Sequence, residues 1–591
     1  MWGKYILIKS QSTIYSIRIL FLPSHIRIQM IKQLIECVPN FSEGRDLNII
    51  KQITNEIESV DGIKLLDVDP GAATNRTVVT FVGEPAAVIE AAYLAIVKAG
   101  ELIDMSKQTG EHARMGATDV CPLVPIANIS MEETAEWSKK LAKRVGETTD
   151  IPVYLYGAAQ PDTKRNVLSI IRGGEYEGFF EKIKKPEWQP DFGPAVYSAR
   201  KGATTIGARD FLIAYNINLN TKSTRIANRI AFDVRETGRV KREGDPYTGK
   251  IITGANGESL REHGSCKAVQ AVGWFIDEYD VAQVSANLTN FSITPIHTFF
   301  DEVQKSCLDR GVRITGSELV GLIPLQAMLD AGKHYLKKQG RSVGVSDAEL
   351  IHIAIKSLGL DELAPFDPAK KIIEYSLTSA DEERLVSLTA KELADETASE
   401  SMAPGGGSIA AYCGALGVSL ATMVANLSAN KPGWEDKVEV FSDWAVKGQA
   451  IKRELLYLVD EDTRSFNGII NAIRMPKDTA ADKTARTEAI EKASQYAAEV
   501  PFKVMQTAYK AKDLLKAMLD IGNKPSVTDA GVGALCCLTA IEGAYMNVRI
   551  NTKDLSEKEF ADSLNKDAAA LLAEAKKVLG AITTEVHNRI V

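Results

Sequence analysis

The hydrophobic pattern of this chain changes once, near residues 377–385, and that change restricts the fold more than any single motif does. Before it, short apolar runs alternate with stretches whose apolar residues recur three and four positions apart, as in strands and helices. After it, the strand pattern disappears, and helical spacing continues in a sequence rich in Ala, Leu, Glu and Lys. The sequence therefore predicts an α/β half, a charged linker at 377–385 and a separate all-α domain at 386–591.

Within the first half, the same kind of pattern occurs twice. Strands are expected at 34–38, 63–68, 77–82, 120–126 and 153–156, and helices at 47–60, 85–103 and 131–145. The pattern then restarts, with strands at 211–219, 269–276 and 282–288, helices at 223–234, 296–308 and 325–336, and a glycine-rich polar insertion at 238–264. We therefore expect two α/β subdomains of similar build, at 30–210 and 211–376.

Composition bears on the partners, the compartment and the metal content expected of this protein. The 591 residues are 45% hydrophobic and 25% charged, as in ordinary globular proteins, and the net charge of −7 gives no reason to expect nucleic acid as a partner. Seven cysteines are few, odd in number and without metal-ligand spacing. This predicts free thiols in a reducing, cytoplasmic compartment and no metal site.

Two segments need a test for membrane insertion. Residues 1–29 carry four Lys or Arg and no acid, and the arginines interrupt the apolar residues, so neither a transmembrane span nor a signal peptide is expected. We expect a poorly ordered tail or an extension from an upstream start codon. Residues 402–429 lack charge over a length that spans a bilayer, but Gly, Ala and Ser dominate, which favours a buried helix in a bundle.

The most informative local motif is Gly110-Glu111-His112-Ala113-Arg114-Met115-Gly116, continued by Ala117-Thr118-Asp119. It lies between a predicted helix and a predicted strand, and catalytic groups are often placed on such loops. Histidine changes charge near neutral pH, so it suits proton transfer. The local chemistry equally allows His112 to bond a backbone carbonyl in a tight turn.

Longer motifs carry a resemblance to a known family. Residues 38–44 (VPNFSEG), 65–71 (LLDVDPG) and 110–116 (GEHARMG) together resemble glutamate formimidoyltransferase, and 403–408 (APGGGS) resembles the formimidoyltetrahydrofolate cyclodeaminase domain. Their order and spacing resemble the fused formimidoyltransferase-cyclodeaminase family, from about Met30 to the C-terminus. The resemblance implies two split-βαβ subdomains followed by an all-α helical bundle.

The same resemblance implies a two-step activity in histidine degradation. A formimino group would pass from N-formimino-L-glutamate to tetrahydrofolate, a co-substrate that is polyglutamylated in the cell. The product would then be cyclodeaminated to 5,10-methenyltetrahydrofolate and ammonia. The family implies a homo-oligomer, with no nucleic-acid or membrane partner. A methenyltetrahydrofolate cyclohydrolase in the C-terminal domain, or a non-catalytic folate-binding scaffold, remains open as an alternative.

For the transferase, the resemblance implies His112 as the proton shuttle and Asp69 as its acidic partner. Asp69 either orients His112 or stabilises the cationic intermediate, and its alternative is a turn residue ahead of Pro70. Asn40 and Ser42 either hold the substrate or form a turn. Arg114 either binds a substrate carboxylate or pairs with Glu111. The family has a proline where this chain has Ala113, which changes loop stiffness only.

The resemblance also implies a folate-binding segment between the two subdomains. It covers Gly193, Pro194, Ala195, Val196, Tyr197, Ser198, Ala199, Arg200, Lys201 and Gly202. Arg200 and Lys201 would meet the pterin or the folate carboxylates, although the interior of the segment departs from the family wording. An ordinary linker is the alternative.

In the helical domain the informative residue is Asp462. It lies four positions from both Leu458 and Phe466 and therefore on an apolar helix face, where an unpaired carboxylate is costly. A buried pair with Arg549 explains it structurally, and the resemblance implies the catalytic aspartate of the cyclodeaminase. Asp460 and Glu461 are expected to be solvated. Ser408 is expected to cap a helix beside the site, and Asn547 and Asn551 to point toward it.

Overall fold

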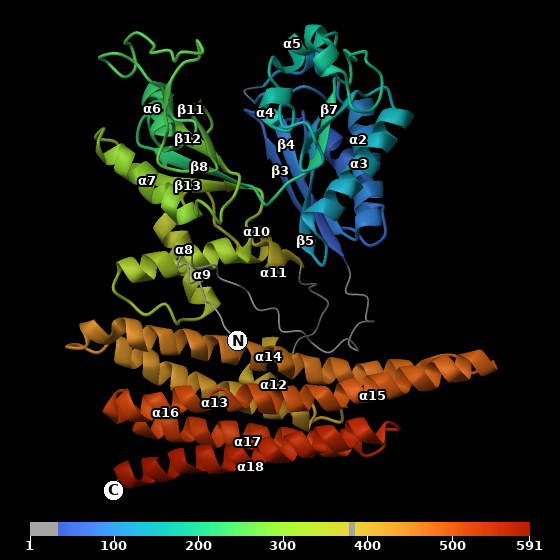
Figure 1. Cartoon of the computed structure of the whole chain (residues 1–591), viewed down its shortest axis with the longest axis vertical. Coiled ribbons are helices and arrows are strands. Elements are labelled where there is room, and N and C mark those ends of the chain that lie inside the picture. The colour runs from blue at the N-terminus through green and yellow to red at the C-terminus, as the bar shows by residue number, and fades with distance from the viewer. Residues whose placement is uncertain (1–32, 111, 378–384, 591) are drawn as a thin grey trace, which may run out of the picture. The chain divides into compact units, whose positions relative to one another are not determined.

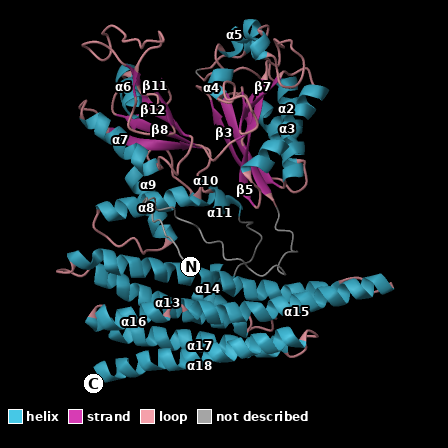
Figure 2. Cartoon of the chain, in the orientation of Figure 1, coloured by secondary structure: helices cyan, strands magenta, loops and turns pink. Residues whose placement is uncertain are grey.

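The computed structural model describes residues 33–110, 112–377 and 385–590, which form two compact units (Figure 1). The first unit ends at Arg209 and omits Leu66–Asp69. The second contains Leu66–Asp69 and the chain from Asp210 onward. Figure 2 shows strands only in the α/β portions and helices in the C-terminal portion, so the predicted fold class is confirmed. The expected tail at 1–29 and nearly all of the expected linker at 377–385 lie outside the described residues.

The first unit begins with a split-βαβ arrangement. Its elements are β1 (Leu34–Cys37), α1 (Leu47–Glu58), β3 (Lys64–Gly71), β4 (Arg76–Gly83), α2 (Pro85–Leu102) and β5 (Thr118–Ala127). The strands lie in the order β3-β4-β1-β5, and β1 is antiparallel to β4 and to β5. The two-residue strand β2 (Asn40–Phe41) lies between β4 and β5.

Further elements extend this sheet beyond β5. They are α3 (Met131–Thr148), β6 (Val153–Gly157), α4 (Leu168–Ile171), α5 (Glu175–Lys182) and β7 (Thr204–Ala208), with β7 parallel to β5 and β6. A capping box between Ser130 and Glu133 begins α3, because the two side chains satisfy backbone N–H groups that the helix leaves free. Strands β2 and β7 were not predicted, since β2 has only two residues and β7 (TTIGA) has a glycine and two threonines in place of a run of large apolar residues.

The second unit repeats the split-βαβ order. Its elements are β8 (Ile213–Leu219), α6 (Thr224–Val234), β11 (Val269–Ile276), β12 (Val281–Leu288), α7 (Ile296–Leu308) and β13 (Ile314–Val320). The strands are antiparallel in the order β11-β12-β8-β13. The predicted similarity of the two subdomains is therefore confirmed. The polar insertion contains only the short pair β9 (Arg239–Val240) and β10 (Arg261–Glu262).

Helices follow this second sheet. The α/β portion continues with α8 (Leu325–Lys338), α9 (Asp347–Leu358), α10 (Pro368–Lys371) and α11 (Ile373–Leu377). The bundle contains α12 (Ala390–Thr397), α13 (Gly406–Ala429), α14 (Val438–Arg474), α15 (Ala480–Tyr509), α16 (Lys512–Ile521), α17 (Val527–Thr552) and α18 (Lys558–Arg589). The segment 342–347 contacts the bundle, because the backbone N–H of Val343 donates to Ser442 Oγ on α14 at 3.0 Å.

The apolar helix α13 lies in the core of the bundle. By length and composition alone, α13 and the segment Lys524–Thr552 are long and apolar enough to cross a membrane. In the bundle, 61% of the most apolar stretch of α13 is buried. Small residues make this possible: Gly417 lies so close to Gly533 that an added Cβ would stand 2.7 Å from its carbonyl oxygen. The prediction of a buried helix at 402–429 is confirmed.

Candidate active sites

His112 lies on the loop before β5, and two close contacts hold that loop. The backbone N–H of Met115 donates to Asp119 Oδ1 at 3.1 Å. Gly116 packs against Ala203, where a Cβ would stand 2.1 Å from the carbonyl oxygen, so glycine is required for this approach. Since His112 is close in the chain to these anchors, they restrict where the loop can place its imidazole.

A buried ion-pair cluster lies beside this loop. Asp119 is fully buried, and its Oδ2 accepts bonds from Arg76 Nη1 at 2.6 Å and from Arg172 Nη2 at 2.7 Å. Arg76 begins β4, and Arg172 directly follows α4. Burial would raise the pKa of Asp119, but the two guanidinium groups, Arg172 first, hold it below its usual value. Asp119 is therefore charged, and paired as a buried charge requires.

This cluster sets the protonation state of His112. The His112 Nδ1 atom lies 2.7 Å from the carbonyl oxygen of Ala113, which only accepts, so Nδ1 carries the proton and Nε2 keeps its lone pair. The positive charge of Arg76, followed by burial and by Arg172, lowers the pKa of His112 to about 3. His112 is consequently a neutral imidazole near pH 7, with Nε2 able to accept a proton.

The other residues expected near His112 divide between the cluster and the scaffold. Asn40 Oδ1 accepts a bond from Arg76 Nε at 2.9 Å, so Asn40 belongs to the cluster. Ser42 is buried and donates to the carbonyl of Gly116 at 2.7 Å, which supports the loop. Arg114 donates to Glu177 at 2.8 Å and so is occupied by a carboxylate of the protein itself. Its alternative partner, Glu111, lies outside the described residues.

Sequence reasoning gave no role to Asp119, Arg76 or Arg172. A weak signal for Asp119 was present, because Asp119 directly precedes the apolar run of β5, and a carboxylate next to a core strand marks a candidate site. The same argument had selected Asp462. Arg76 and Arg172 gave no comparable signal, since each stands at the end of an apolar run, where a solvated arginine is common.

Asp69 lies in the part of β3 that belongs to the second unit. Its Oδ2 accepts the backbone N–H of Gly321 at 3.2 Å. Two residues before it, Asp67 pairs with Lys371 at 3.5 Å. Burial raises the pKa of Asp67, while Lys371 lowers it and the charge of Asp69 raises it further. Asp69 is thus held by a backbone donor at the edge of β13, and its catalytic role stays a prediction.

The predicted folate segment is fixed against the His112 loop by its backbone and by one aromatic residue. The hydroxyl of Tyr197 donates to the carbonyl of Met115 at 2.6 Å. Val196 beside it is 71% exposed. Arg200 donates to the carbonyl of Glu101 at 2.7 Å. These contacts connect the segment to the transferase site, while its part in folate binding stays a prediction.

Asp462 lies on α14, and its side chain contacts the N-terminal turn of α13. Its Oδ2 accepts the hydroxyl of Ser408 at 3.0 Å, and the backbone N–H of Ser408 also donates to this carboxylate. Gly407 lies so close that an added Cβ would stand 2.1 Å from Asp462 Oδ1. Burial raises the pKa of Asp462, and the two bonds from Ser408 offset part of that rise. The expectation that Ser408 caps α13 by its own side chain is wrong, since Gly405 is the N-cap and the hydroxyl serves Asp462.

Two expectations for neighbouring residues are also wrong. Asp460 and Glu461 were expected to be solvated, but both are only 8% exposed. Glu461 accepts bonds from Tyr496 at 2.5 Å and from Arg464 at 2.6 Å. Phe466, expected on the buried face, is 37% exposed. Asp460 and Glu461 are buried because α14 packs against both α13 and α15, so that a second face of the helix is covered.

Late helix α17 contributes one residue to this area. Asn547 lies beside Gly406, where an added Cβ would stand 3.4 Å from Asn547 Nδ2. Asn551 instead donates to the carbonyl of Ala497 on α15 at 2.7 Å. Arg549, the alternative partner of Asp462, donates to the hydroxyl of Tyr545 at 3.2 Å.

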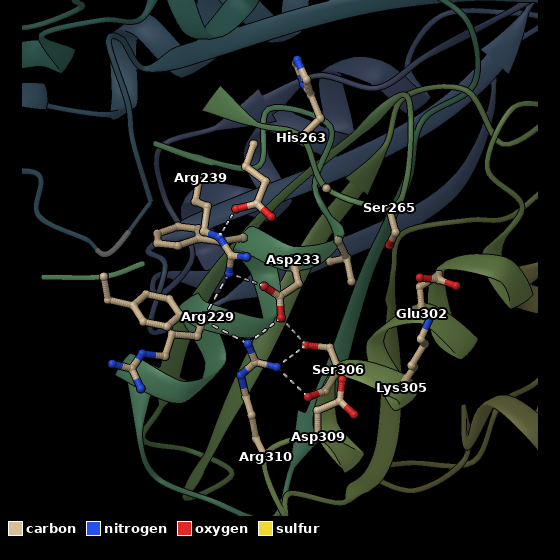
Figure 3. A pocket seen from close by; sticks show the side chains of 15 residues that line it. Arg229, Asp233, Arg239, His263, Ser265, Glu302, Lys305, Ser306, Asp309 and Arg310 are labelled. Atoms are coloured by element: carbon tan, nitrogen blue, oxygen red, sulfur yellow. Dashed lines mark hydrogen bonds and ion pairs between the residues drawn. The ribbon is translucent and has the colours of Figure 1, made fainter. Parts of the chain in front are cut away.

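A separate polar cavity of about 710 Å³ lies in the second unit (Figure 3). Asp233 occupies its centre, pairing with Arg239 at 3.0 Å and Arg310 at 2.6 Å, and it accepts the hydroxyl of Ser306 at 2.8 Å. Asp233 lies on α6, Ser306 lies on α7 and Arg310 follows α7, so the pair with Arg239 fastens the polar insertion to α6 and the other two bonds connect α6 with the end of α7. The cavity contains none of the predicted site residues.

Within the described residues, cysteine and metal chemistry add no further site. All seven cysteines are free thiols in the structure. In the described ranges, no group of three or more His, Cys, Asp or Glu side chains is arranged to hold a metal ion.

Comparison with known proteins identifies the family of this chain. The N-terminal subdomain of the formiminotransferase domain matches residues 34–209, the formiminotransferase domain matches 214–378, and formiminotransferase-cyclodeaminase matches 389–570. These matches cover the α/β portions and the helical bundle, and together they indicate a bifunctional enzyme.

Relatives extend the match over nearly the whole chain. Formimidoyltransferase-cyclodeaminase of Mus musculus is 40% identical over 545 residues, which is 92% of this chain and 97% of the relative. Glutamate formimidoyltransferase of Thermoplasma acidophilum is 41% identical over 53% of this chain and 95% of its own length. Methenyltetrahydrofolate cyclohydrolase of Methylorubrum extorquens is 30% identical over 34% of this chain and 95% of its own length. This chain belongs to the formimidoyltransferase-cyclodeaminase family.

Proposed function

We propose that this chain transfers the formimino group of N-formimino-L-glutamate to tetrahydrofolate and then converts 5-formiminotetrahydrofolate to 5,10-methenyltetrahydrofolate and ammonia. The main support for this proposal is the 40% identity, over 92% of the chain, to a protein whose name includes both activities. Both candidate sites are consistent with it, since each centres on one partly or fully enclosed titratable group.

In the transfer step, His112 acts as the proton shuttle. The N5 nitrogen of tetrahydrofolate loses a proton as it attacks the formimino carbon, and the departing glutamate nitrogen must gain one. His112 enters this cycle as a neutral base, because Arg76 and burial keep its pKa low. Its Nδ1–H bond to Ala113 leaves the lone pair of Nε2 to accept the proton. Asp69 stabilises the cationic intermediate, and residues 193–202 contact the folate.

In the second step, Asp462 moves a proton between the two nitrogens of the formimino-folate. N10 attacks the formimino carbon, the ring closes, and the amino group leaves as ammonia. A carboxylate whose pKa is raised by burial takes a proton from N10 more readily than an exposed one does and returns it to the departing nitrogen. Ser408 holds the charged form in place.

We further propose the cellular setting that accompanies these reactions. The enzyme acts in histidine degradation in the cytoplasm, uses polyglutamylated tetrahydrofolate and needs neither a metal ion, nucleic acid nor a membrane. Joining both sites in one chain raises the concentration of the intermediate near the second site.

A homo-oligomer is part of the same proposal. Helices α13 and α17 pack together, and each carries an exposed apolar stripe. Leu416 and Leu427 on α13 are 48% and 47% exposed, and Leu535 and Met546 on α17 are 52% and 63% exposed. Exposed apolar area of this kind favours association with another copy. Leu535→Asp is expected to lower the mass measured by light scattering, whereas Leu308→Asp, at an exposed site in the α/β portion, is not.

A coupled assay tests the two activities. Purified protein receives tetrahydrofolate and formiminoglutamate, and the absorbance of methenyltetrahydrofolate is followed together with ammonia. His112→Ala is expected to stop all product formation, whereas Asp462→Ala accumulates 5-formiminotetrahydrofolate. If wild type makes neither product while it still binds folate, the chain is a scaffold and the enzyme assignment fails.

One further outcome concerns the C-terminal domain alone. The relative from Methylorubrum extorquens is named as a methenyltetrahydrofolate cyclohydrolase. If wild type forms 5-formiminotetrahydrofolate, releases no ammonia and hydrolyses added methenyltetrahydrofolate, the second activity is the cyclohydrolase.

A further inference from the structure

Two guanidinium groups share one buried carboxylate beside His112, and the proposed steps assign neither of them a contact with the substrate. Arg76 and Arg172 carry two positive charges against the single negative charge of Asp119. The cluster therefore has one surplus positive charge. In a largely buried place such a surplus is costly unless an anion neutralises it.

Arg172 retains donor capacity that the protein does not use. Its Nη2 atom binds Asp119, while its Nε atom is buried and has no hydrogen-bond partner within the described structure. The Arg172 side chain is only 14% exposed. Asp119 is already bound elsewhere, because Oδ1 accepts the N–H of Met115 and Oδ2 accepts bonds from both arginines through their Nη atoms. A guanidinium fixed on one edge offers its remaining N–H groups to a planar, two-oxygen anion such as a carboxylate.

We infer that Arg172, with Arg76 beside it, binds the α-carboxylate of the formimino amino acid, and that Asp119 is a positioning residue that holds the two arginines together. The inference rests on the proposed transferase function. The α-carboxylate is preferred over the γ-carboxylate because His112 protonates the departing nitrogen. The α-carboxylate is attached to the carbon that bears this nitrogen, whereas the γ-carboxylate lies two carbons further along the side chain.

Binding of that carboxylate changes the protonation of His112. The groups that act on His112 are Arg76 from β4, Arg172 after α4, Asp119 on β5 and the carbonyl of Ala113. Neutralising the surplus charge removes part of the main cause of the low pKa of His112, so this pKa rises in the complex. His112 is then a base that holds its acquired proton long enough to deliver it to the leaving nitrogen.

The experiment compares three substrates in wild type and in Arg172→Gln. They are N-formimino-L-glutamate, N-formimino-4-aminobutyrate, which lacks the α-carboxylate, and N-formimino-2-aminobutyrate, which lacks the γ-carboxylate. We expect Arg172→Gln to raise KM about 10- to 100-fold for the two substrates with an α-carboxylate, the usual worth of a charge-assisted bond. For N-formimino-4-aminobutyrate, KM, or Ki where turnover is absent, should not change.

Controls separate this role from a structural one. Arg144→Gln, which breaks the ion pair with Glu90 on the helices of the same unit, should leave all three constants unchanged. Arg172→Lys keeps the charge and should recover part of the loss. In wild type, the acid limb of kcat should lie at higher pH than that of kcat/KM, since the former reports the complex and the latter the free enzyme. In Arg172→Gln the separation should shrink.

Three results would overturn the inference. An equal rise in KM for all three substrates makes Arg172 structural. A rise in KM confined to the two substrates with a γ-carboxylate would mean that the arginines bind the γ-carboxylate. If the acid limbs of the kcat and kcat/KM profiles lie at the same pH, carboxylate binding does not raise the pKa of His112. If wild type does not turn over formiminoglutamate at all, the proposed function fails instead, before any variant is compared.

Discussion

Gly407→Ala tests whether the position of Asp462 controls cyclodeamination. An added Cβ at residue 407 would stand 2.1 Å from Asp462 Oδ1 and 2.6 Å from its Cγ. Ordinary van der Waals contacts begin at 3.4 Å, so the carboxylate must move by about 1.3 Å. The atoms in the way belong to a side chain, so Asp462 can turn aside while both helices keep their places.

The magnitude follows from this displacement. A shift of about 1 Å in a reacting group costs on the order of 100-fold in rate, or about 2.7 kcal/mol of activation free energy. We therefore expect Gly407→Ala to lower kcat for ammonia release about 100-fold. Transfer of the formimino group, which depends on His112 in the other unit, should keep its wild-type rate.

The assay supplies 5-formiminotetrahydrofolate directly and measures ammonia, with the transferase assayed separately in the same preparation. Gly405→Ala is the matched control, because a Cβ at that neighbouring glycine meets nothing within 4 Å. It should retain kcat within a few-fold. The reasoning is refuted if Gly407→Ala releases ammonia at the wild-type rate, or if Gly405→Ala loses as much activity as Gly407→Ala does.

Two further predictions concern pH. Because the folded-state pKa of Asp462 is raised, its contribution to stability is present below the unfolded pKa and lost as pH rises through the folded one. Asp462→Asn should therefore raise the thermal unfolding midpoint near pH 7, with a gain that fades toward pH 4, and a loss at pH 7 would contradict this. The pKa of His112 falls from 6.5 unfolded to about 3 folded, so its contribution to stability is lost as pH drops below 6.5. His112→Gln should reduce the fall in unfolding free energy between pH 7 and pH 4 in urea titrations, and an undiminished fall would count against it.

Hydrophobic spacing was enough to predict most long elements of the fold. The helix predicted at 85–103 and the strand predicted at 269–276 appear as α2 and β11. The strands β2, β7 and β13 were missed, because β2 has only two residues and glycine and polar residues interrupt the apolar pattern of β7 and β13. The sequence pattern of α14 was also incomplete. Its apolar spacing identified one buried face but not the second one, which includes Glu461 and exists only because two neighbouring helices cover it.

The sequence by itself determined the class of each half and, through its motifs, the candidate residues His112, Asp69 and Asp462. Only the tertiary structure decided what surrounds His112. Strand β2 stands between β4 and β5, with Asn40 opposite Val78 on one side and Val120 on the other. That register brings Arg76 and Asp119 together across strands far apart in the chain. Local patterns do not report such a pairing, because the free energy of a buried ion pair depends on distances that exist only after the strands have paired.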